Sequence, residues 1–95
     1  MRTIWKFPLK IIETQVITMP GIFLKGDRDV ITKGNVLKVG VMNNEAFIWA
    51  MVDNDAPQVI RMIHMIWTGG PCDCLYEDYI GTIVYDGLVY HVFAE

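Results

Sequence analysis

The fold is decided by residues 35–53, NVLKVGVMNNEAFIWAMVD, where two runs of strand-forming residues flank Asn43-Asn44. Asparagine tolerates the positive φ angles of a tight primed turn, so the segment predicts a β-hairpin with strands over Asn35–Met42 and Glu45–Asp53. The second strand alternates two apolar sets, Ala46, Ile48, Ala50 and Val52 on one side and Phe47, Trp49 and Met51 on the other. A strand with two apolar faces is typical of the centre of a sheet or of a strand that is covered on both sides.

The rest of the chain adds more strand patterns. Strands are predicted over five further segments: Arg2–Lys10, Glu13–Met19, Val59–Thr68, Asp78–Tyr85 and Leu88–Ala94. The last two flank Asp86-Gly87, a strong hairpin signal. A helix competes only over 59–68, where the β-branched and aromatic content favours a strand. We therefore expect an all-β, mainly antiparallel fold, a small sandwich or partly open barrel of about six to seven strands with little or no helix.

The chain has 95 residues, which is enough for a single domain over 1–95. The charged, glycine-containing stretch 21–34 is expected to form a protruding hairpin or loop. The apolar fraction is 53% and the mean hydropathy is +0.31. Because a domain of this size cannot bury that much apolar surface by itself, we expect a homo-oligomer or a partner surface.

The number and distribution of charged residues argue against duplex nucleic acid as a partner. Eight Lys and Arg residues are scattered among eleven Asp and Glu residues, and the formal net charge is −3. A protein that binds duplex nucleic acid needs clustered cations to displace counterions, so we expect no such partner. No signal peptide begins the sequence, and no apolar run approaches the ~20 residues of a membrane helix. A cytoplasmic protein without a membrane partner is therefore predicted.

No pattern in the sequence is typical of catalysis. The chain contains no serine, which excludes a serine triad. Cys72 and Cys74 are one residue apart, a spacing that is poor for a structural zinc site and strained for a disulfide. The paired carboxylates fall in turns, where acids usually cap backbone groups. We therefore expect no catalytic site, no metal and no cofactor, and the protein is predicted not to be an enzyme.

Ligand binding is predicted where the strand over 59–68 ends. In strand geometry Arg61 and Trp67 share one face, while His64 lies on the other. Arg61 could meet a phosphate and Trp67 could stack on a base. Thr68, Gly69 and Gly70 follow, and the two glycines could expose successive backbone N–H groups as an anion nest. The alternative is a strand that ends in an ordinary Gly-Gly-Pro turn, with Arg61 in an ion pair.

Two further features favour contact with a partner protein. The stretch 21–34 carries charged side chains, among them Lys25, Asp27 and Arg28. The C-terminal hairpin presents Tyr90 and Phe93, and aromatic residues are enriched at protein interfaces. Ordinary cross-strand packing is the alternative for these aromatic residues.

Several strings in the sequence resemble a family of small uncharacterised proteins common in tailed bacteriophages. They are Thr3-Ile4-Trp5-Lys6-Phe7, Met19-Pro20, Ile48-Trp49-Ala50-Met51-Val52-Asp53, Thr68-Gly69-Gly70-Pro71, Tyr79-Ile80-Gly81-Thr82 and His91-Val92-Phe93. The resemblance covers nearly the whole chain apart from 21–34. It implies a phage accessory protein that acts in the cytoplasm of an infected bacterium.

Small phage accessory proteins often counter host defence. The first hypothesis is therefore a sponge that binds and sequesters a small nucleotide-like immune signal. The second is a protein inhibitor that occludes a host defence complex, such as a CRISPR effector or a nuclease. A structural or regulatory phage protein is the third.

Overall fold

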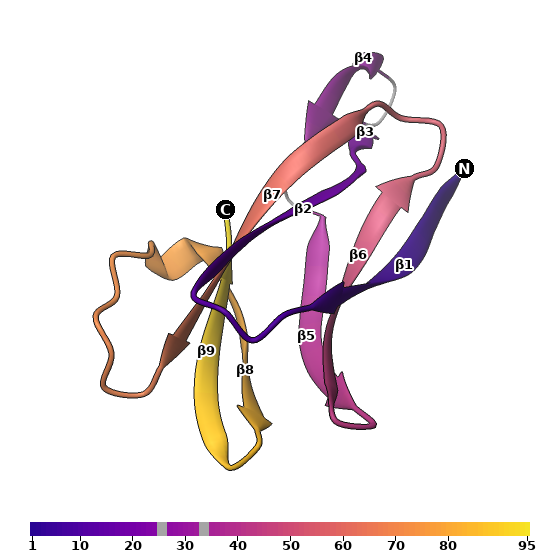
Figure 1. The fold of residues 1–95 in the computed structure, drawn as a ribbon. Coiled ribbons are helices and arrows are strands. Elements are labelled where there is room, and N and C mark those ends of the chain that lie inside the picture. Colours follow the sequence, from indigo (N-terminus) through magenta and orange to yellow (C-terminus); the bar gives the residue numbers. More distant parts are fainter. Residues whose placement is uncertain (25–26, 33–34) are drawn as a thin grey trace.

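The chain folds into β-strands along almost its whole length. The structure is a computed structural model that describes residues 1–24, 27–32 and 35–95. Its elements are β1 (Arg2–Leu9), β2 (Thr14–Pro20), β3 (Ile22–Leu24), β4 (Asp27–Thr32), β5 (Val36–Met42), β6 (Glu45–Asp53), β7 (Gln58–Trp67), the short 3₁₀ helix η1 (Tyr76–Asp78), β8 (Tyr79–Tyr85) and β9 (Leu88–Ala94) (Figure 1). The predicted all-β class is confirmed.

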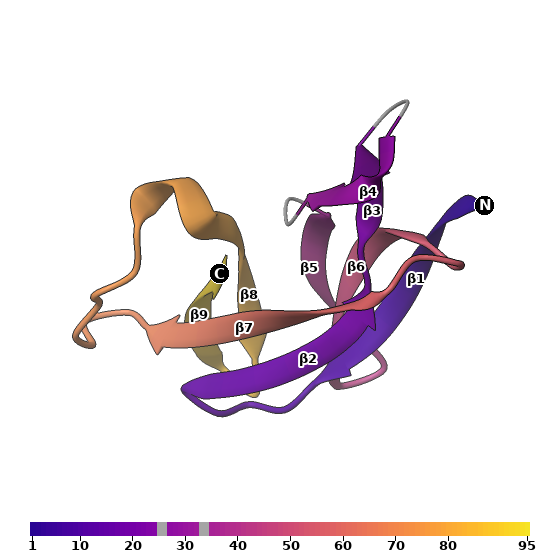
Figure 2. The ribbon, with the colours of Figure 1, turned by 90° about the horizontal axis from the view of Figure 1, so that it is seen from above.

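Two antiparallel sheets pack face to face as a sandwich that does not close into a barrel. One sheet has the strand order β1-β6-β5 and the other β2-β7-β9-β8. The chain crosses from the first sheet to the second between β1 and β2, along one side of the sandwich (Figure 2). At another side the two sheets meet again, because β5 lies against β8. This gives the partly open arrangement that the strand pattern predicts.

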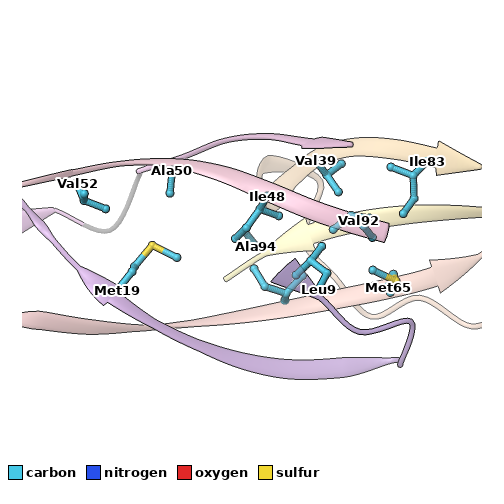
Figure 3. Close-up of a cluster of buried hydrophobic side chains, with 12 residues drawn as sticks. Leu9, Met19, Val39, Ile48, Ala50, Val52, Met65, Ile83, Val92 and Ala94 are labelled. Carbon is cyan, nitrogen blue, oxygen red and sulfur yellow. The ribbon is translucent and has the colours of Figure 1, made fainter. Parts of the chain in front are cut away.

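The core lies between the two sheets and follows from the period of two along each strand. The residues of β6 that point inward, Ala46, Ile48, Ala50 and Val52, are buried. They face buried residues of the other sheet, including Met65 of β7 and Val92 of β9 (Figure 3). The central place predicted for β6 is confirmed, since it pairs with both β1 and β5. Its second apolar set, on the outer side, is half-buried.

Both predicted hairpin turns have the backbone dihedral angles that a primed two-residue turn requires. Asn43 and Asn44 have φ angles of 52° and 63°, and Asp86 and Gly87 have 50° and 79°. Positive φ at both central positions is the geometry of a primed two-residue hairpin turn, which matches the twist of the flanking strands.

The stretch 21–34 contains the two short strands β3 and β4, which pair antiparallel with Ile22 opposite Thr32. They project from the sandwich (Figure 1). At their base the backbone N–H of Phe23 donates to the Asp53 carboxylate at 2.8 Å. Within the described ranges, no helix is long and apolar enough to cross a membrane.

Candidate ligand-binding site

Two open pockets lie next to each other and share Asp78 and Glu95 in their walls. We name them the Trp67 pocket and the Arg61 pocket. Their volumes are about 460 Å³ and 440 Å³, within the range of small-molecule sites. The Trp67 pocket is lined by Glu13, Thr14, His64, Ile66, Trp67, Pro71, Asp73, Cys74, Leu75, Asp78 and Glu95. The Arg61 pocket is lined by Val36, Arg61, Glu77, Asp78, Tyr79, Ile80, Ala94 and Glu95.

Arg61 is a charged side chain on the core face of β7. It pairs with Ile17 of β2 and is only 5% exposed. Its Nε is buried without a hydrogen-bond partner, and the ion pairs found among the described residues do not include it. Burial lowers the pKa of Arg61, and the Asp78 carboxylate acts in the opposite direction. Because an arginine stays protonated in proteins, Arg61 is a buried and incompletely satisfied cation.

The ion pair weighed for Arg61 as an alternative is therefore not found among the described residues. Arg61 and Trp67 line two neighbouring pockets rather than a single one, and their cooperation on one ligand stays a prediction. Trp67 instead shares its pocket with His64, which strand geometry assigned to another surface. The reason is local: β7 ends at Trp67, and the chain turns back so that Gly70 lies against the indole ring.

The turn after β7 is built around Trp67. A Cβ added to Gly70 would lie 2.7 Å from Cε2 of the ring, so only glycine fits there. The Gly70 N–H donates to the Trp67 carbonyl at 2.9 Å, and the Thr68 hydroxyl pairs with Nε2 of His91 at 2.8 Å. Gly69 has a φ of 90°. The predicted anion nest is therefore incomplete, because the Gly70 N–H already has an acceptor.

Both histidines of the chain lie in hydrogen-bonded networks that sequence reasoning missed. His64 Nδ1 is 3.2 Å from the Thr14 hydroxyl, and its Nε2 is 2.8 Å from a Glu95 carboxylate oxygen. His91 bridges Thr68 and Thr82 through its two ring nitrogens. These partners are far apart in sequence and meet only through strand pairing, so the sequence carries no signal for them. With both nitrogens engaged, each imidazole is fixed in orientation.

Cys74 lines the Trp67 pocket beside these groups. Its pKa is raised to about 11, first by burial, then by a hydrogen bond with Cys72 and by the negative charges of Glu95 and Asp73. The thiol is therefore protonated at neutral pH, and a thiol is a much weaker nucleophile than a thiolate. Cys72 and Cys74 are not joined in a disulfide, and no metal-binding group of three side chains occurs in the described part of the chain.

The residues predicted for partner contact are spread over different environments. Tyr90 packs against the core, and Phe93 is half-buried in an edge contact with Tyr79 at 5.6 Å between ring centroids. Lys25 lies outside the described residues. Asp27 and Arg28 belong to β4, and the positions of their side chains are not described. The two aromatic residues thus follow the alternative of cross-strand packing.

A family model described as "Domain of unknown function (DUF7352)" matches residues 1–95, the whole chain. The chain belongs to this family. No curated protein and no solved structure matches it.

Proposed function

We propose that the chain is a non-catalytic binding protein that sequesters a small nucleotide-like ligand, with Arg61 holding its anionic group. The observation that carries the proposal is the buried Nε of Arg61, which has no partner beside an open pocket. A buried and incompletely paired charge is costly, and a phosphate or carboxylate bound in the pocket against the guanidinium would offset part of that cost. The planar guanidinium also matches two oxygens of such a group at once.

The remaining walls of the Arg61 pocket suit the uncharged parts of a nucleotide. Carboxylates of Glu77 and Asp78 can accept hydrogen bonds from sugar hydroxyls and base amino groups. The exposed ring of Tyr79 offers a face for stacking. The same carboxylates repel additional phosphates, so the pocket favours a ligand with one anionic group near Arg61 over a polyphosphate.

Sequestration without turnover is supported by the chemistry around the Trp67 pocket. The Cys74 thiol is protonated at neutral pH. The resemblance to small tailed-phage proteins supports a setting in the infected bacterial cytoplasm, where a binder lowers the free concentration of an immune signal.

The test is a calorimetric titration with nucleoside monophosphates, cyclic dinucleotides and ADP-ribose derivatives. The wild type is expected to bind at least one of them, and Arg61→Met is expected to lose that binding. Lys10→Met is the control, because it removes an exposed positive charge at a residue that Gln15 contacts through the backbone, and it should bind like the wild type. The proposal fails if the wild type binds none of these nucleotides, or if Arg61→Met binds one of them as tightly as the wild type does. Catalytic conversion of any panel member would overturn the non-catalytic part.

A further inference from the structure

The outer side of the β1-β6-β5 sheet is a second surface, separate from both pockets described above. We call it the β6 face and define it by Ile4, Lys6, Lys38, Met42, Phe47, Trp49 and Met51, which point away from the core on alternate positions of the three strands. Ile4 is 55% exposed and Met42 47% exposed. Apolar side chains from three neighbouring strands thus lie together at the surface, which is typical of an interaction site.

This face has a defined hollow. An open pocket of about 530 Å³ is lined by Ile4, Leu37, Gly40, Met42 and Trp49. The indole of Trp49 lies against Gly40, where a Cβ would be 3.0 Å from the ring, so the missing side chain lets the aromatic ring form the floor of the hollow. Leu37 reaches the rim because the register of β5 shifts between Val36 and Lys38. A hollow with an aromatic floor can receive an apolar anchor from a partner.

The charges around the hollow are mostly positive, although the chain as a whole is acidic. Lys6 and Lys38 are exposed on this side, and Nζ of Lys6 lies 4.4 Å from the centroid of the Phe47 ring. Among the acids of β1, β5 and β6, Asp53 is buried and only Glu45 is exposed. The carboxylates that line the two pockets lie elsewhere. The β6 face therefore complements a partner that carries negative charge.

We infer that the β6 face is a docking surface for another protein, one that presents apolar anchors flanked by Asp or Glu. A second copy using the same face would bring lysines opposite lysines, which costs energy. An anionic bilayer is disfavoured because the net charge of the chain is −3. The inference does not depend on the Arg61 pocket, so either one can fail without the other.

The test uses a short acetylated peptide with two leucines flanked by glutamates, and a matched peptide with lysines in place of the glutamates. Binding is followed through the indole N–H signal of Trp49 in NMR spectra, assigned with Trp49→Phe. We expect the glutamate peptide to shift this signal and the lysine peptide to leave it unchanged. Lys6→Glu/Lys38→Glu should weaken glutamate-peptide binding at least tenfold. Val84→Ser, at an exposed position of β8, should bind like the wild type.

Four results would overturn the inference. The first is no shift of the Trp49 signal with millimolar glutamate peptide, and the second is equal binding of both peptides. The third is a dimer in analytical ultracentrifugation that Met42→Glu dissociates, because it would assign the face to a second copy. The fourth is stronger binding to phosphatidylglycerol vesicles than to the glutamate peptide, because it would assign the face to a lipid surface. Folding of each variant is checked by thermal unfolding.

Discussion

Arg61 places a charge where an apolar side chain would fit the fold better. It is flanked on the core face of β7 by the fully buried Ile63, yet its Nε has no partner. Replacing buried charges with apolar residues of similar volume is often neutral or stabilising by about 1–4 kcal/mol. We therefore expect Arg61→Met to keep or raise the free energy of unfolding of the unliganded protein while it abolishes ligand binding.

Urea unfolding of wild type, Arg61→Met and the control Lys10→Met measures this directly. A loss of stability of several kcal/mol in Arg61→Met alone would contradict the account, because it would mean that Arg61 has a structural partner in the folded chain. Gain of stability together with loss of binding is the combination expected of a residue kept for function.

Cys74 provides a second prediction at the scale of one residue. Its pKa rises from 9.0 to about 11, chiefly through burial, so a two-unit shift lowers the thiolate fraction roughly a hundredfold near neutral pH. In Cys72→Ala, which removes the contribution of Cys72 and keeps burial, the largest cause of the shift, iodoacetamide should still modify Cys74 slowly at neutral pH and faster at alkaline pH. The same variant unfolded in urea is the control and should react much faster. Equal rates in the folded and unfolded chain would show that the Cys74 pKa is not raised.

The raised pKa of Cys74 also determines how the contribution of this residue to the free energy of unfolding changes with pH. Below pH 9 the thiol is protonated in both the folded and the unfolded chain, so its contribution to stability is fully present. As the pH rises toward 11, the unfolded chain loses the proton first. The contribution of Cys74 to the stability of the fold is therefore lost as the pH rises through the folded pKa.

At the scale of elements, the strands and turns could be predicted because their signals are local. The two apolar sets of β6 indicated a central strand, and Asn43-Asn44 and Asp86-Gly87 indicated tight turns. The site was only partly predictable. Strand periodicity correctly aligned Arg61 with the core residues of β7, but it carries no information on the pockets, so the place of Trp67 and His64 in one pocket was not predicted. The contacts of His64 depend on Thr14 and Glu95, which no local pattern connects to it.

The contact between β5 and β8 includes a close approach at one glycine. Gly81 lies in β8 at a register shift, and a Cβ there would be 2.8 Å from Cγ1 of Val39 in β5. We expect Gly81→Ala to lower the free energy of unfolding by about 1–3 kcal/mol, the usual cost of overpacking a core. Adding Val39→Ala should recover part of the loss, since it removes the methyl group that the new Cβ meets.

A double-mutant cycle in urea measures this coupling. Additive losses from Gly81→Ala and Val39→Ala would mean that the cost at Gly81 comes from its backbone and not from the contact with β5. Gly69→Ala is a useful comparison, because Gly69 has a φ of 90° and no atom within 4 Å of the added Cβ.

At the scale of the whole molecule, two surfaces of opposite charge character lie on one small sandwich. The pockets beside the β2-β7-β9-β8 sheet are lined with carboxylates around a buried arginine, whereas the β6 face is apolar and basic. Self-association, expected from the high apolar content, stays a prediction. A protein of this kind can hold a small ligand on one side and a partner protein on the other, since the two surfaces do not overlap.

The central claim is that Arg61 holds the anionic group of a small ligand. The most direct measurement is a crystal structure of the protein grown with a ligand that the calorimetric panel identifies. The account predicts density for a small molecule in the Arg61 pocket, with anionic oxygens about 2.7–2.9 Å from the guanidinium nitrogens. An empty pocket, with the Arg61 guanidinium closed onto Glu77, Asp78 or Glu95 in an ion pair, would contradict it.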